Sequence, residues 1–370
     1  MSHAIAGEQS ANTVHVLTDW LAARLGEVRG VRIERLDAPA ANGFSNITML
    51  FDARWTDKSG LQERRFVARI QPTGEGLFPT YDVGRQFNVM RALESSSVPV
   101  PATLWLEPDS SILGAPFYVM EYVDGHIPSD DPSFAAAGWF MDLSVPQRGL
   151  LIQNALAALV DIHALDWRQL GVDWLQKPGS GSAAARELAY YEEFYRWAAE
   201  GLHVPVIEAG LAWARDHIPS EKDLVLSWGD SRIGNVIFDD DLGVRAVIDW
   251  EGASIAPREK DLGHWLQLTH VYTEQFGLAL PEGCPGRDAL LGRYEDYSGY
   301  RLGDVHFFEV MAGIHSSIQA MRALSLMGRT SGAGRNEAAI ANNPFTRGLA
   351  RLIGFDLPAE GGLDILTGKR

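Results

Sequence analysis

The stretch SWGDSRIGNVIFDDDLGVRAVIDWEGA, residues 227–253, decides the fold. Apolar runs at 225–228, 235–238 and 244–250 have the length of short strands, and DDDLG between the last two is typical of a hairpin turn. The segments before and after it have helical periodicity. We therefore expect a small β unit inside a helical region, and this unit carries the densest group of polar side chains in the chain.

Outward from this stretch, the chain divides into a strand-rich part and a helical part. The first part shows two helical patterns, at 12–28 and 83–95, and five strand patterns, at 31–38, 46–55, 64–71, 103–107 and 115–123. The second part shows helical patterns at 146–165, 182–200, 204–217, 257–276, 286–299, 303–327 and 336–353. The sequence thus predicts an α+β protein with a small β-rich lobe and a larger helical lobe.

We place the boundary between these lobes at a hinge. The predicted N-terminal lobe comprises residues 1–123 with the hinge at 120–124, and the helical C-terminal lobe comprises 124–370 and includes the catalytic and metal-binding segment 225–253. A cleft between two such lobes is a natural place for a ligand.

Composition excludes several classes of protein. With 32 basic and 48 acidic residues the formal charge is −16, which disfavours nucleic acid as a partner. The acidic excess would suit a cationic substrate, although it also serves solubility. The single cysteine, Cys284, excludes an intramolecular disulfide and a multi-cysteine zinc site. No secretory leader or membrane-spanning pattern is visible, so we expect a cytoplasmic protein without a membrane partner. The oligomeric state cannot be read from the sequence.

Three oxygen-bearing side chains in the deciding stretch point to metal-assisted chemistry. Asp249 ends an apolar strand, where a carboxylate is costly unless it gains a partner, and a divalent cation is a common one. Asn235 offers a second oxygen, and Mg²⁺ prefers one or two carboxylates plus substrate phosphates. Asp230 precedes them on a turn, where it could accept a hydroxyl proton. The order base, metal ligand, metal ligand matches phosphoryl-transferring enzymes. Turn chemistry alone is the alternative explanation for Asp230 and Asn235.

The sequence around these residues resembles a known family. SWGDSRIGN (227–235) stands where aminoglycoside phosphotransferases and choline-kinase-like enzymes have His-Gly-Asp-x4-Asn, and IDWEGASIAPREKDLGHW (248–265) resembles their downstream aspartate segment. The resemblance spans about residues 40–270 and implies a protein-kinase-like two-lobe fold. It implies an enzyme that uses ATP and Mg²⁺ to phosphorylate a hydroxyl of a small molecule.

The resemblance also implies roles for single residues. Asp230 would be the catalytic base, Asn235 and Asp249 would hold Mg²⁺, and Asp261 would be a structural aspartate at the head of a helix. The nucleotide would be held by a hairpin loop over its phosphates, by a cationic strand residue and by a hinge that pairs with adenine: Asn42, Gly43 and Ser45, Arg69, and Glu121, Tyr122 and Val123.

Three positions depart from the family pattern. Trp228 replaces the histidine before Gly-Asp, and an indole can donate one hydrogen bond but cannot titrate. Arg69 replaces the phosphate-binding lysine, and Gln86 replaces the helix glutamate that pairs with it. These departures leave a catalytically weak nucleotide-binding pseudokinase or sensor module as the alternative function.

The acceptor and several accessory residues stay open. An aminoglycoside would suit an acidic pocket, whereas a hydroxyacyl thioester or an apolar alcohol would suit the aromatic-rich helical lobe. Glu251 is either a third metal ligand or an anchor for the following loop. His264 and His270 lie six residues apart on a predicted helix and do not share a face, so we do not expect them to bind a metal together.

Overall fold

A computed structural model describes residues 2–37, 46–221 and 223–357, with side chains from residue 12 onward. The described chain separates into two compact units. Unit 1 comprises the described residues of 1–76, 80–91 and 101–123, and unit 2 comprises those of 77–79, 92–100 and 124–370. One break between the units therefore falls directly after Val123, at the predicted hinge, while two short segments of the N-terminal part belong to unit 2.

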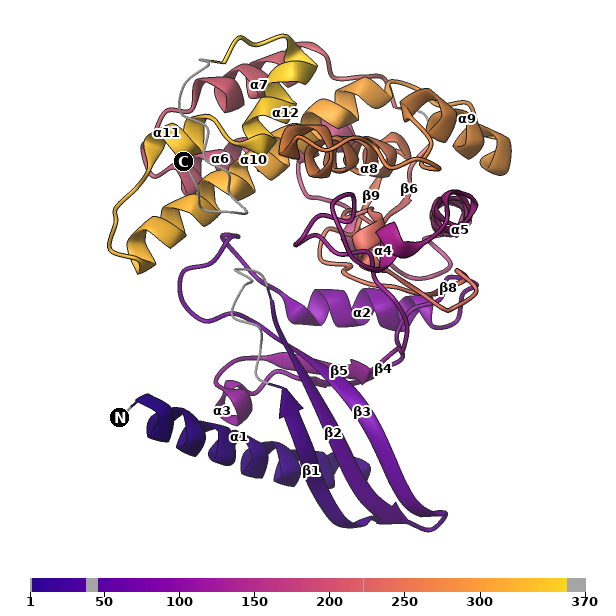
Figure 1. Cartoon of the computed structure of the whole chain (residues 1–370), viewed down its shortest axis with the longest axis vertical. Coiled ribbons are helices and arrows are strands. Elements are labelled where there is room, and N and C mark those ends of the chain that lie inside the picture. Colours follow the sequence, from indigo (N-terminus) through magenta and orange to yellow (C-terminus); the bar gives the residue numbers. More distant parts are fainter. Residues whose placement is uncertain (1, 38–45, 222, 358–370) are drawn as a thin grey trace. The chain divides into compact units, whose positions relative to one another are not determined.

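Unit 1 is built on a five-stranded antiparallel sheet with the order β1-β2-β3-β5-β4 (Figure 1). Its strands are β1 (Arg29–Asp37), β2 (Ile47–Asp57), β3 (Gly60–Ile70), β4 (Thr103–Glu107) and β5 (Phe117–Glu121). Its helices are α1 (Ser2–Leu25), α3 (Ser110–Leu113) and most of α2 (Val83–Leu93). The predicted strands are thus confirmed, with β5 shorter than its apolar pattern.

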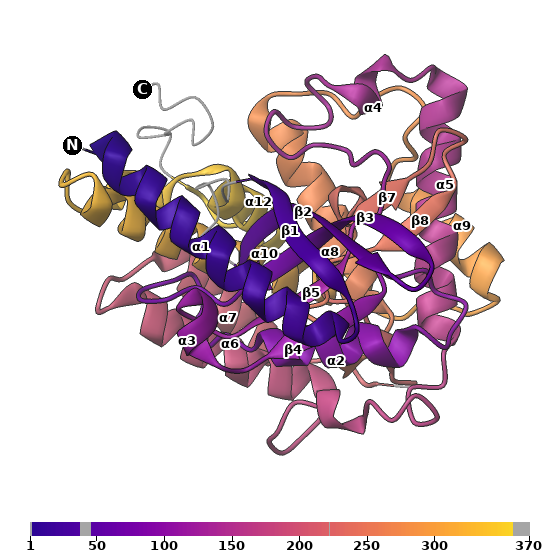
Figure 2. The same cartoon turned by 90° about the horizontal axis from the view of Figure 1, so that it is seen from below.

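The two faces of this sheet are used differently, because successive residues of a strand point to opposite faces. Helix α1 crosses one face (Figure 2), where Leu17, Trp20 and Leu21 pack against strand residues such as Phe51 and Phe117 in one buried cluster. Tyr118, next to Phe117, therefore points to the opposite face. There its hydroxyl donates to Gln86 of α2, which places α2 on that second face.

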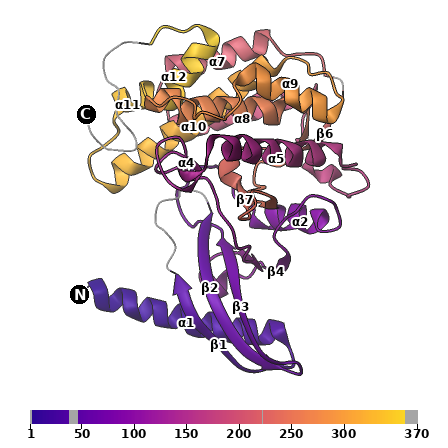
Figure 3. The same cartoon turned by 45° about the vertical axis from the view of Figure 1, so that its right-hand side comes forward.

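Unit 2 is mainly helical and is centred on the long helix α10 (Val305–Thr330). Figures 1 and 3 show α8 and α10 side by side, with α6, α7, α11 and α12 around α10. The helices of this unit are α4 (Trp139–Asp142), α5 (Val145–Ala164), α6 (Ala183–Ala199), α7 (Pro205–Asp216), α8 (Glu259–Tyr272), α9 (Arg287–Ser298), α10, α11 (Glu337–Ala341) and α12 (Pro344–Ile353). Short 3-10 helices cover Asp173–Leu175, Ile233–Asn235 and Glu274–Phe276.

The deciding stretch forms the predicted β unit. Strands β7 (Val236–Phe238) and β8 (Val244–Val247) make an antiparallel hairpin whose turn is the acidic segment before Gly243. Strand β6 (Val225–Ser227) pairs with β9 (Ser254–Ala256), a strand that the sequence analysis did not predict. The segments 228–235 and 248–253 connect these two ribbons.

The predicted single helix at 336–353 is wrong, because the structure divides it into α11 and α12. Asn343 accepts hydrogen bonds from the amides of Phe345 and Thr346, and Thr346 bonds back to the Asn343 amide, which is a capping box. Pro344 is the first residue of α12, where its missing N–H costs nothing. The apolar periodicity continues across Asn343 and Pro344, so the pattern predicted one helix although these two residues begin a new one.

Among the described residues, no helix has the length and apolar character that a bilayer crossing requires.

The closest approach of α8 to α10 depends on a glycine. A Cβ on Gly263 would lie 2.5 Å from the backbone carbon of Phe308 and 2.6 Å from the amide nitrogen of Glu309. Backbone cannot yield as a side chain can, so α8 would have to move away from α10. Since α8 also holds the polar loop described below, Gly263 fixes the position of that loop.

We predict that Gly263→Ala lowers the free energy of unfolding by about 1–3 kcal/mol, the usual cost of overpacking a tight contact. Urea denaturation followed by circular dichroism measures it. Gly292→Ala on α9 is the matched control, because a Cβ there meets no atom within 4 Å. Equal stability of the two variants would contradict this account of the α8–α10 contact.

Candidate active site

The β7–β8 hairpin brings Asn235 and Asp249 to the same end of a two-stranded ribbon. Asn235 directly precedes β7, and its carbonyl accepts a hydrogen bond of 3.0 Å from the amide of Ile248, which follows β8. Asp249 is the next residue. A spacing of fourteen residues in the sequence thus becomes adjacency across one ribbon.

Asp230 lies against Asn235 through two hydrogen bonds. The side-chain nitrogen of Asn235 donates to Asp230 Oδ2 at 2.7 Å and to the Asp230 carbonyl at 3.0 Å. The amide nitrogen of Asn235 is thereby occupied, which leaves its oxygen as the atom that could face a cation. The structure therefore brings together Asp230 and Asn235, as the sequence predicted.

The two oxygens of Asp230 have different surroundings. Oδ1 accepts from His264 Nε2 at 2.9 Å and from Arg232 Nε at 3.2 Å, whereas the hydrogen bond to Oδ2 comes from Asn235. A carboxylate oxygen accepts about two hydrogen bonds. Oδ1 is therefore saturated and Oδ2 keeps one acceptor position. The side chain is 25% exposed, so a substrate hydroxyl could reach that position.

Asp230 is held as a carboxylate. Burial raises the pKa of Asp230, but the charge of Arg232 and the hydrogen bonds from His264 and Asn235 outweigh burial and leave that pKa well below its ordinary value. A carboxylate can only accept hydrogen bonds, so His264 must present a protonated Nε2 to it. Such a group orients a hydroxyl well, but it is a weak base.

Arg232 links Asp230 to a second acidic residue, Asp130. Its guanidinium bonds Asp130 through Nη1 and Asp230 through Nε, and the side chain is largely buried. Burial lowers the pKa of Arg232, but the two carboxylates more than offset it and raise that pKa overall. A Cβ on Gly234 would lie 2.6 Å from Arg232 Nη1 and 2.9 Å from Asp130 Oδ1, so a larger residue there would displace the ends of this bridge.

The loop that carries Asp230 is fixed by Asp261, the fully buried third residue of α8. Its Oδ1 accepts from the Ser227 hydroxyl at 3.0 Å and from the Gly229 amide at 2.8 Å. Its Oδ2 accepts from the Trp228 amide at 2.8 Å, and its carbonyl accepts from the Ser231 hydroxyl at 2.6 Å. These contacts fit the structural role that the sequence suggested for Asp261.

Behind Asp261 a buried relay leads to two other helices. His163 of α5 donates from Nε2 to Asp261 Oδ2 at 2.9 Å, and its Nδ1 lies 2.7 Å from the hydroxyl of Tyr294 on α9. Burial raises the pKa of Asp261, but the hydrogen bond from His163 and further contacts outweigh it, so the net pKa is lowered. Asp261 is therefore a charged anchor between α5, α8 and the loop.

Trp228 takes up a structural task at the position where the family has histidine. Its indole nitrogen donates to the carbonyl of Ile248 at 2.9 Å, and the Trp250 indole donates to Val247 at 3.0 Å. Both rings are buried. They hold the backbone just before Asp249, whose φ of +61° is rare for a residue with a side chain. A residue kept in an unfavourable conformation by its neighbours is typical of a functional site.

The loops of Asp230 and Asp249 touch through two glycines. A Cβ on Gly229 would lie 2.1 Å from the carbonyl oxygen of Gly252, and Gly229 has a φ of +93°. No other residue fits there, because both the left-handed backbone and the close contact exclude a side chain. This crossing keeps the proposed base and the proposed metal ligand close together.

Unit 1 contains those of the other predicted nucleotide-binding residues that the structure describes. Arg69 lies on the α2 face of the sheet, in register with Tyr118, and its Nη1 donates to Thr48 Oγ1 at 2.7 Å. Gln86 is buried and accepts from the Tyr118 hydroxyl at 3.1 Å. The residues expected to replace the family's lysine and glutamate thus occupy one face, with Tyr118 next to both.

The predicted hinge follows β5. The amide of Glu121 donates to Ala102 at 2.9 Å and that of Tyr122 donates to Arg65 at 3.3 Å, so unit 1 already uses two of the three hinge amides. Asn42, Gly43 and Ser45 lie outside the described residues, and their predicted role stays a prediction.

A family model named "phosphotransferase enzyme family" matches residues 37–301, which is most of the chain and includes Asp230, Asn235, Asp249, Asp261 and His264.

The chain belongs to the phosphotransferase enzyme family.

Solved structures of this family have the same fold. A protein from Ralstonia eutropha, described as a candidate aminoglycoside phosphotransferase, is 22% identical with a TM-score of 0.67, and the match covers 92% of this chain and 98% of that one. Aminoglycoside phosphotransferase APH(4)-Ia, solved with AMP-PNP and hygromycin B, is 15% identical with a TM-score of 0.54 over 91% and 97% of the two chains. The predicted kinase-like fold, with a small β-rich and a larger helical part, is confirmed.

Curated relatives are much longer than this phosphotransferase. Mouse acyl-CoA dehydrogenase family member 10 is 34% identical over 206 residues, which are 55% of this chain and 18% of the relative. Chicken acyl-CoA dehydrogenase family member 11 is 32% identical over 210 residues, which are 55% of this chain and 25% of the relative. The chain thus matches only a minor part of each.

The donor set of the phosphotransferase fits Mg²⁺. Asn235 and Asp249 offer one amide oxygen and one carboxylate, and a magnesium ion in such sites takes its remaining ligands from substrate phosphates and water. The described residues contain no cluster of three histidine, cysteine or acidic side chains that would hold a metal by themselves. A site that needs the nucleotide to complete it is what phosphoryl transfer requires.

Sequence reasoning missed the roles of His264 and Arg232. His264 was considered only as a metal ligand, whereas it bonds Asp230. Its position three residues after Asp261 puts both side chains on one face of α8, and this spacing is the signal that could have revealed it. Arg232 gave no such signal, because its partner Asp130 is 102 residues away in the chain.

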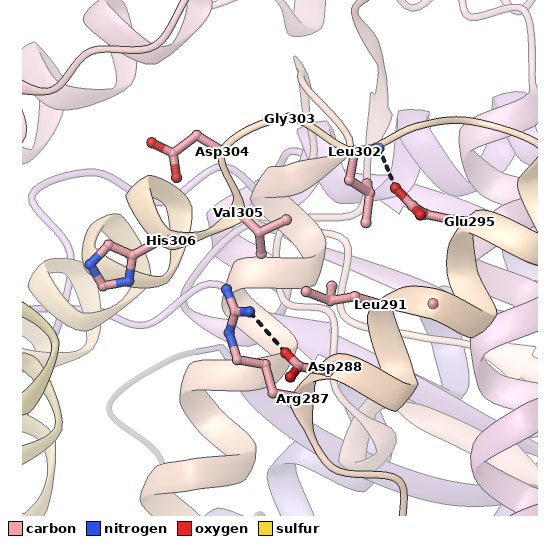
Figure 4. Close-up of a pocket in the computed structure, with 10 residues that line it drawn as sticks. Arg287, Asp288, Leu291, Glu295, Leu302, Gly303, Asp304, Val305 and His306 are labelled. Atoms are coloured by element: carbon pink, nitrogen blue, oxygen red, sulfur yellow. Dashed lines mark hydrogen bonds and ion pairs between the residues drawn. The ribbon is translucent and has the colours of Figure 1, made fainter.

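A pocket of about 420 Å³ lies elsewhere in unit 2, between α9 and the start of α10 (Figure 4). Its lining includes Arg287, Asp288 and His306, and none of the candidate active-site residues. Arg287 there pairs with Asp288 and with the buried Glu309, so its charge is already balanced.

We predict that Asp261→Asn destabilises the phosphotransferase and removes part of its acid sensitivity. An amide cannot accept from all four donors, and each buried donor left unpaired costs roughly 1–3 kcal/mol. Because the folded-state pKa of Asp261 is lowered, its stabilising contribution is present above the unfolded pKa of about 3.9 and is lost as the pH falls through the lower folded value.

Urea denaturation at a series of pH values below 7 tests this. Asp240→Asn is the control, because that side chain is 96% exposed on the β7–β8 turn. A pH dependence of Asp261→Asn identical to that of the parent would show that Asp261 does not contribute in this way.

Proposed function

We propose that this protein is an ATP- and Mg²⁺-dependent kinase that phosphorylates a hydroxyl group of a small molecule. One observation carries the proposal: Asp230 keeps a single open acceptor position, on Oδ2, and the Asn235 amide is bonded to that same oxygen. The hairpin places Asp249 beside Asn235. The oxygen that would bind the substrate hydroxyl and the two oxygens that would bind the metal thus belong to two loops that are held together.

In the proposed reaction Asp230 directs the attacking hydroxyl. The substrate hydroxyl donates to Oδ2, its oxygen forms the new bond to the γ-phosphorus of ATP, the bond to the β-phosphate oxygen breaks, and the proton passes to Asp230 as ADP leaves. Mg²⁺ would neutralise phosphate charge when bound. Positioning and electrostatics supply most of the rate in such reactions, so the low basicity of Asp230 is compatible with catalysis.

ATP is the proposed donor because a family member of the same fold was solved with AMP-PNP. In this chain Arg69 would contribute charge to the phosphates, and an arginine fork can contact two phosphate oxygens. The hinge would read adenine through the Val123 amide and backbone carbonyls, since the amides of Glu121 and Tyr122 are already used.

The surroundings of Asp230 disfavour a polycationic acceptor. Asp130 is paired with Arg232, and the buried Glu187 is paired with Lys177 and Lys260. Burial raises the pKa of Glu187, but the two lysines overcome it and lower that pKa to about 2. Both carboxylates are thus already paired with cations of the protein, and they leave little for aminoglycoside amines to bind.

A hydroxyl carried by an acyl thioester is the second candidate acceptor. The relatives that share this region are named acyl-CoA dehydrogenase family members. In unit 2 a group of rings on α6 and α10 belongs to the apolar core, and His315 is its partly exposed member: Tyr191 stacks on His315 at 4.9 Å and Phe194 lies 5.9 Å from it. Burial and nearby cations lower the pKa of His315 to about 3, so this ring stays neutral and suits an apolar group.

A panel assay separates these candidates from each other and from a pseudokinase. ADP release would be measured with MgATP against kanamycin, hygromycin B and hydroxyacyl thioesters of coenzyme A. Acceptor-dependent ADP release with any of them supports the kinase. Nucleotide binding without turnover in a broad panel of hydroxylated compounds would favour the sensor module.

We predict that Asp230→Asn lowers turnover by about 10²–10⁴-fold, the usual contribution of a positioned acid–base group. The amide is nearly isosteric, so the loop keeps its shape while Oδ2 or its substitute loses the ability to take a proton. Steady-state ADP release measures the effect, with Asp240→Asn as a control of equal charge change. Turnover within threefold of the parent would refute the role of Asp230.

We predict that Asp249→Ala abolishes Mg²⁺-dependent binding of AMP-PNP in titration calorimetry. Asp249→Asn is the companion variant, because asparagine tolerates the left-handed backbone at this position and keeps one oxygen. It should bind with an affinity between those of the parent and Asp249→Ala. Unchanged affinity in both variants, with and without EDTA, would exclude Asp249 as a metal ligand.

A further inference from the structure

One side chain at the site has no counterpart in the family motif that the sequence displays. His264 lies in the second turn of α8, is 8% exposed, and bonds Asp230 Oδ1 at 2.9 Å. The position where the family has a histidine, directly before Gly229, holds Trp228, which faces Ile248 instead. An imidazole therefore contacts the proposed base, Asp230, but it comes from α8 and not from the position directly before Gly229.

The backbone and side chains of the loop 227–231 explain how His264 reaches Asp230. Four of the five residues of this loop bond Asp261 of α8: Ser227, Trp228, Gly229 and Ser231. The fifth residue, Asp230, bonds His264 of the same helix. Asp261 and His264 are three residues apart on one helical face. Helix α8 thus sets the backbone of the loop with one side chain and the carboxylate of Asp230 with another.

The bond from His264 decides which oxygen of Asp230 is open. His264 and Arg232 fill Oδ1, and the single bond from Asn235 leaves Oδ2 with one acceptor position. Without His264, Oδ1 would also have an open position. The carboxylate could then rotate about its Cβ–Cγ bond. A substrate hydroxyl could bind either Oδ1 or Oδ2, and one of these positions would not be aligned for attack on the γ-phosphorus.

We propose that His264 is a positioning residue for phosphoryl transfer: its Nε2–H fixes the Asp230 carboxylate so that Oδ2 alone receives the acceptor hydroxyl. This inference rests on the proposed kinase function. His264 does not itself take the substrate proton, because Nε2 already carries the proton that it donates to Asp230. It acts through Asp230 and contacts neither substrate nor nucleotide in this role.

The test compares His264→Leu with His264→Gln in steady-state kinetics with MgATP and the acceptor that the panel assay identifies. Leucine removes the donor, and we expect kcat to fall by about 10–100-fold, since small misplacements of reacting groups have effects of this size. The KM for ATP should stay within about threefold of the parent. Glutamine carries an N–H in a similar place, so it should restore kcat to within about fivefold of the parent.

His270→Leu is the matched control on the same helix, because His270 bonds Glu274 and Gln275 rather than Asp230. Thermal unfolding of all variants separates loss of fold from loss of positioning. If His264→Leu does not fold, His264→Asn replaces it, because asparagine is too short to place its N–H at Asp230. Double variants with Asp230→Asn add a second check: removal of His264 should have little further effect once the carboxylate is gone.

Crystal structures of the variants give a readout that does not need turnover. The inference predicts a rotated or two-state Asp230 carboxylate in the leucine variant and the parent orientation in the glutamine variant. A kcat of His264→Leu within threefold of the parent would overturn it, as would a glutamine variant as impaired as the leucine variant with Asp230 unmoved. Absence of phosphoryl transfer in the parent would instead refute the proposed function.

Discussion

The buried carboxylate of Asp261 is the interaction on which the rest of the site depends. It gathers the Ser227 hydroxyl and the amides of Trp228 and Gly229, and these bonds define the path of the chain into Asp230. A buried charge is costly unless every lone pair is used, and here His163 uses the remaining one. The cost of removing this ion from water is offset only when the loop, α5 and α8 are assembled together, so the loop that carries Asp230 forms as part of the core.

From this anchor the structure distributes tasks among three neighbouring groups. Helix α8 sets the Asp230 carboxylate through His264, the β7–β8 hairpin sets Asn235, and two buried indoles hold the backbone before Asp249. The indole of Trp228 cannot change its protonation, so the position that the family gives to a titratable ring has become a fixed hydrogen-bond donor. The imidazole at the site comes from α8 instead. The departure at Trp228 by itself suggests a weakened enzyme. It is accompanied by a second feature, the imidazole of His264 bonded to Asp230.

Much of the fold could be predicted because its signals are local. Alternating strands, the hairpin turn before Gly243 and the amphipathic helices depend on residues close in sequence, and they occur where the patterns place them. Asp249 could be singled out because a carboxylate at the end of an apolar strand is unusual, and Asp230 and Asn235 because they precede it in the same polar stretch.

The rest depends on contacts that the sequence does not display. The bond between His264 and Asp230 joins α8 to a loop 34 residues earlier in the chain, and the bridge from Arg232 needs Asp130 from a remote loop. The division between α11 and α12 had a local signal, Asn343 followed by Pro344, but continuous apolar periodicity outweighed it. Acceptor preference could not be predicted from the sequence, which left an aminoglycoside, a hydroxyacyl thioester and an apolar alcohol open.

The crossing of Gly229 and Gly252 has a consequence for how this enzyme can change. A Cβ on Gly229 would lie 2.1 Å from the carbonyl oxygen of Gly252, so no side chain can be placed at Gly229 without moving the backbone. A side chain at Gly229 would therefore push the Asp230 loop away from the Asp249 loop, so variation that keeps these two carboxylates together has to occur at other positions.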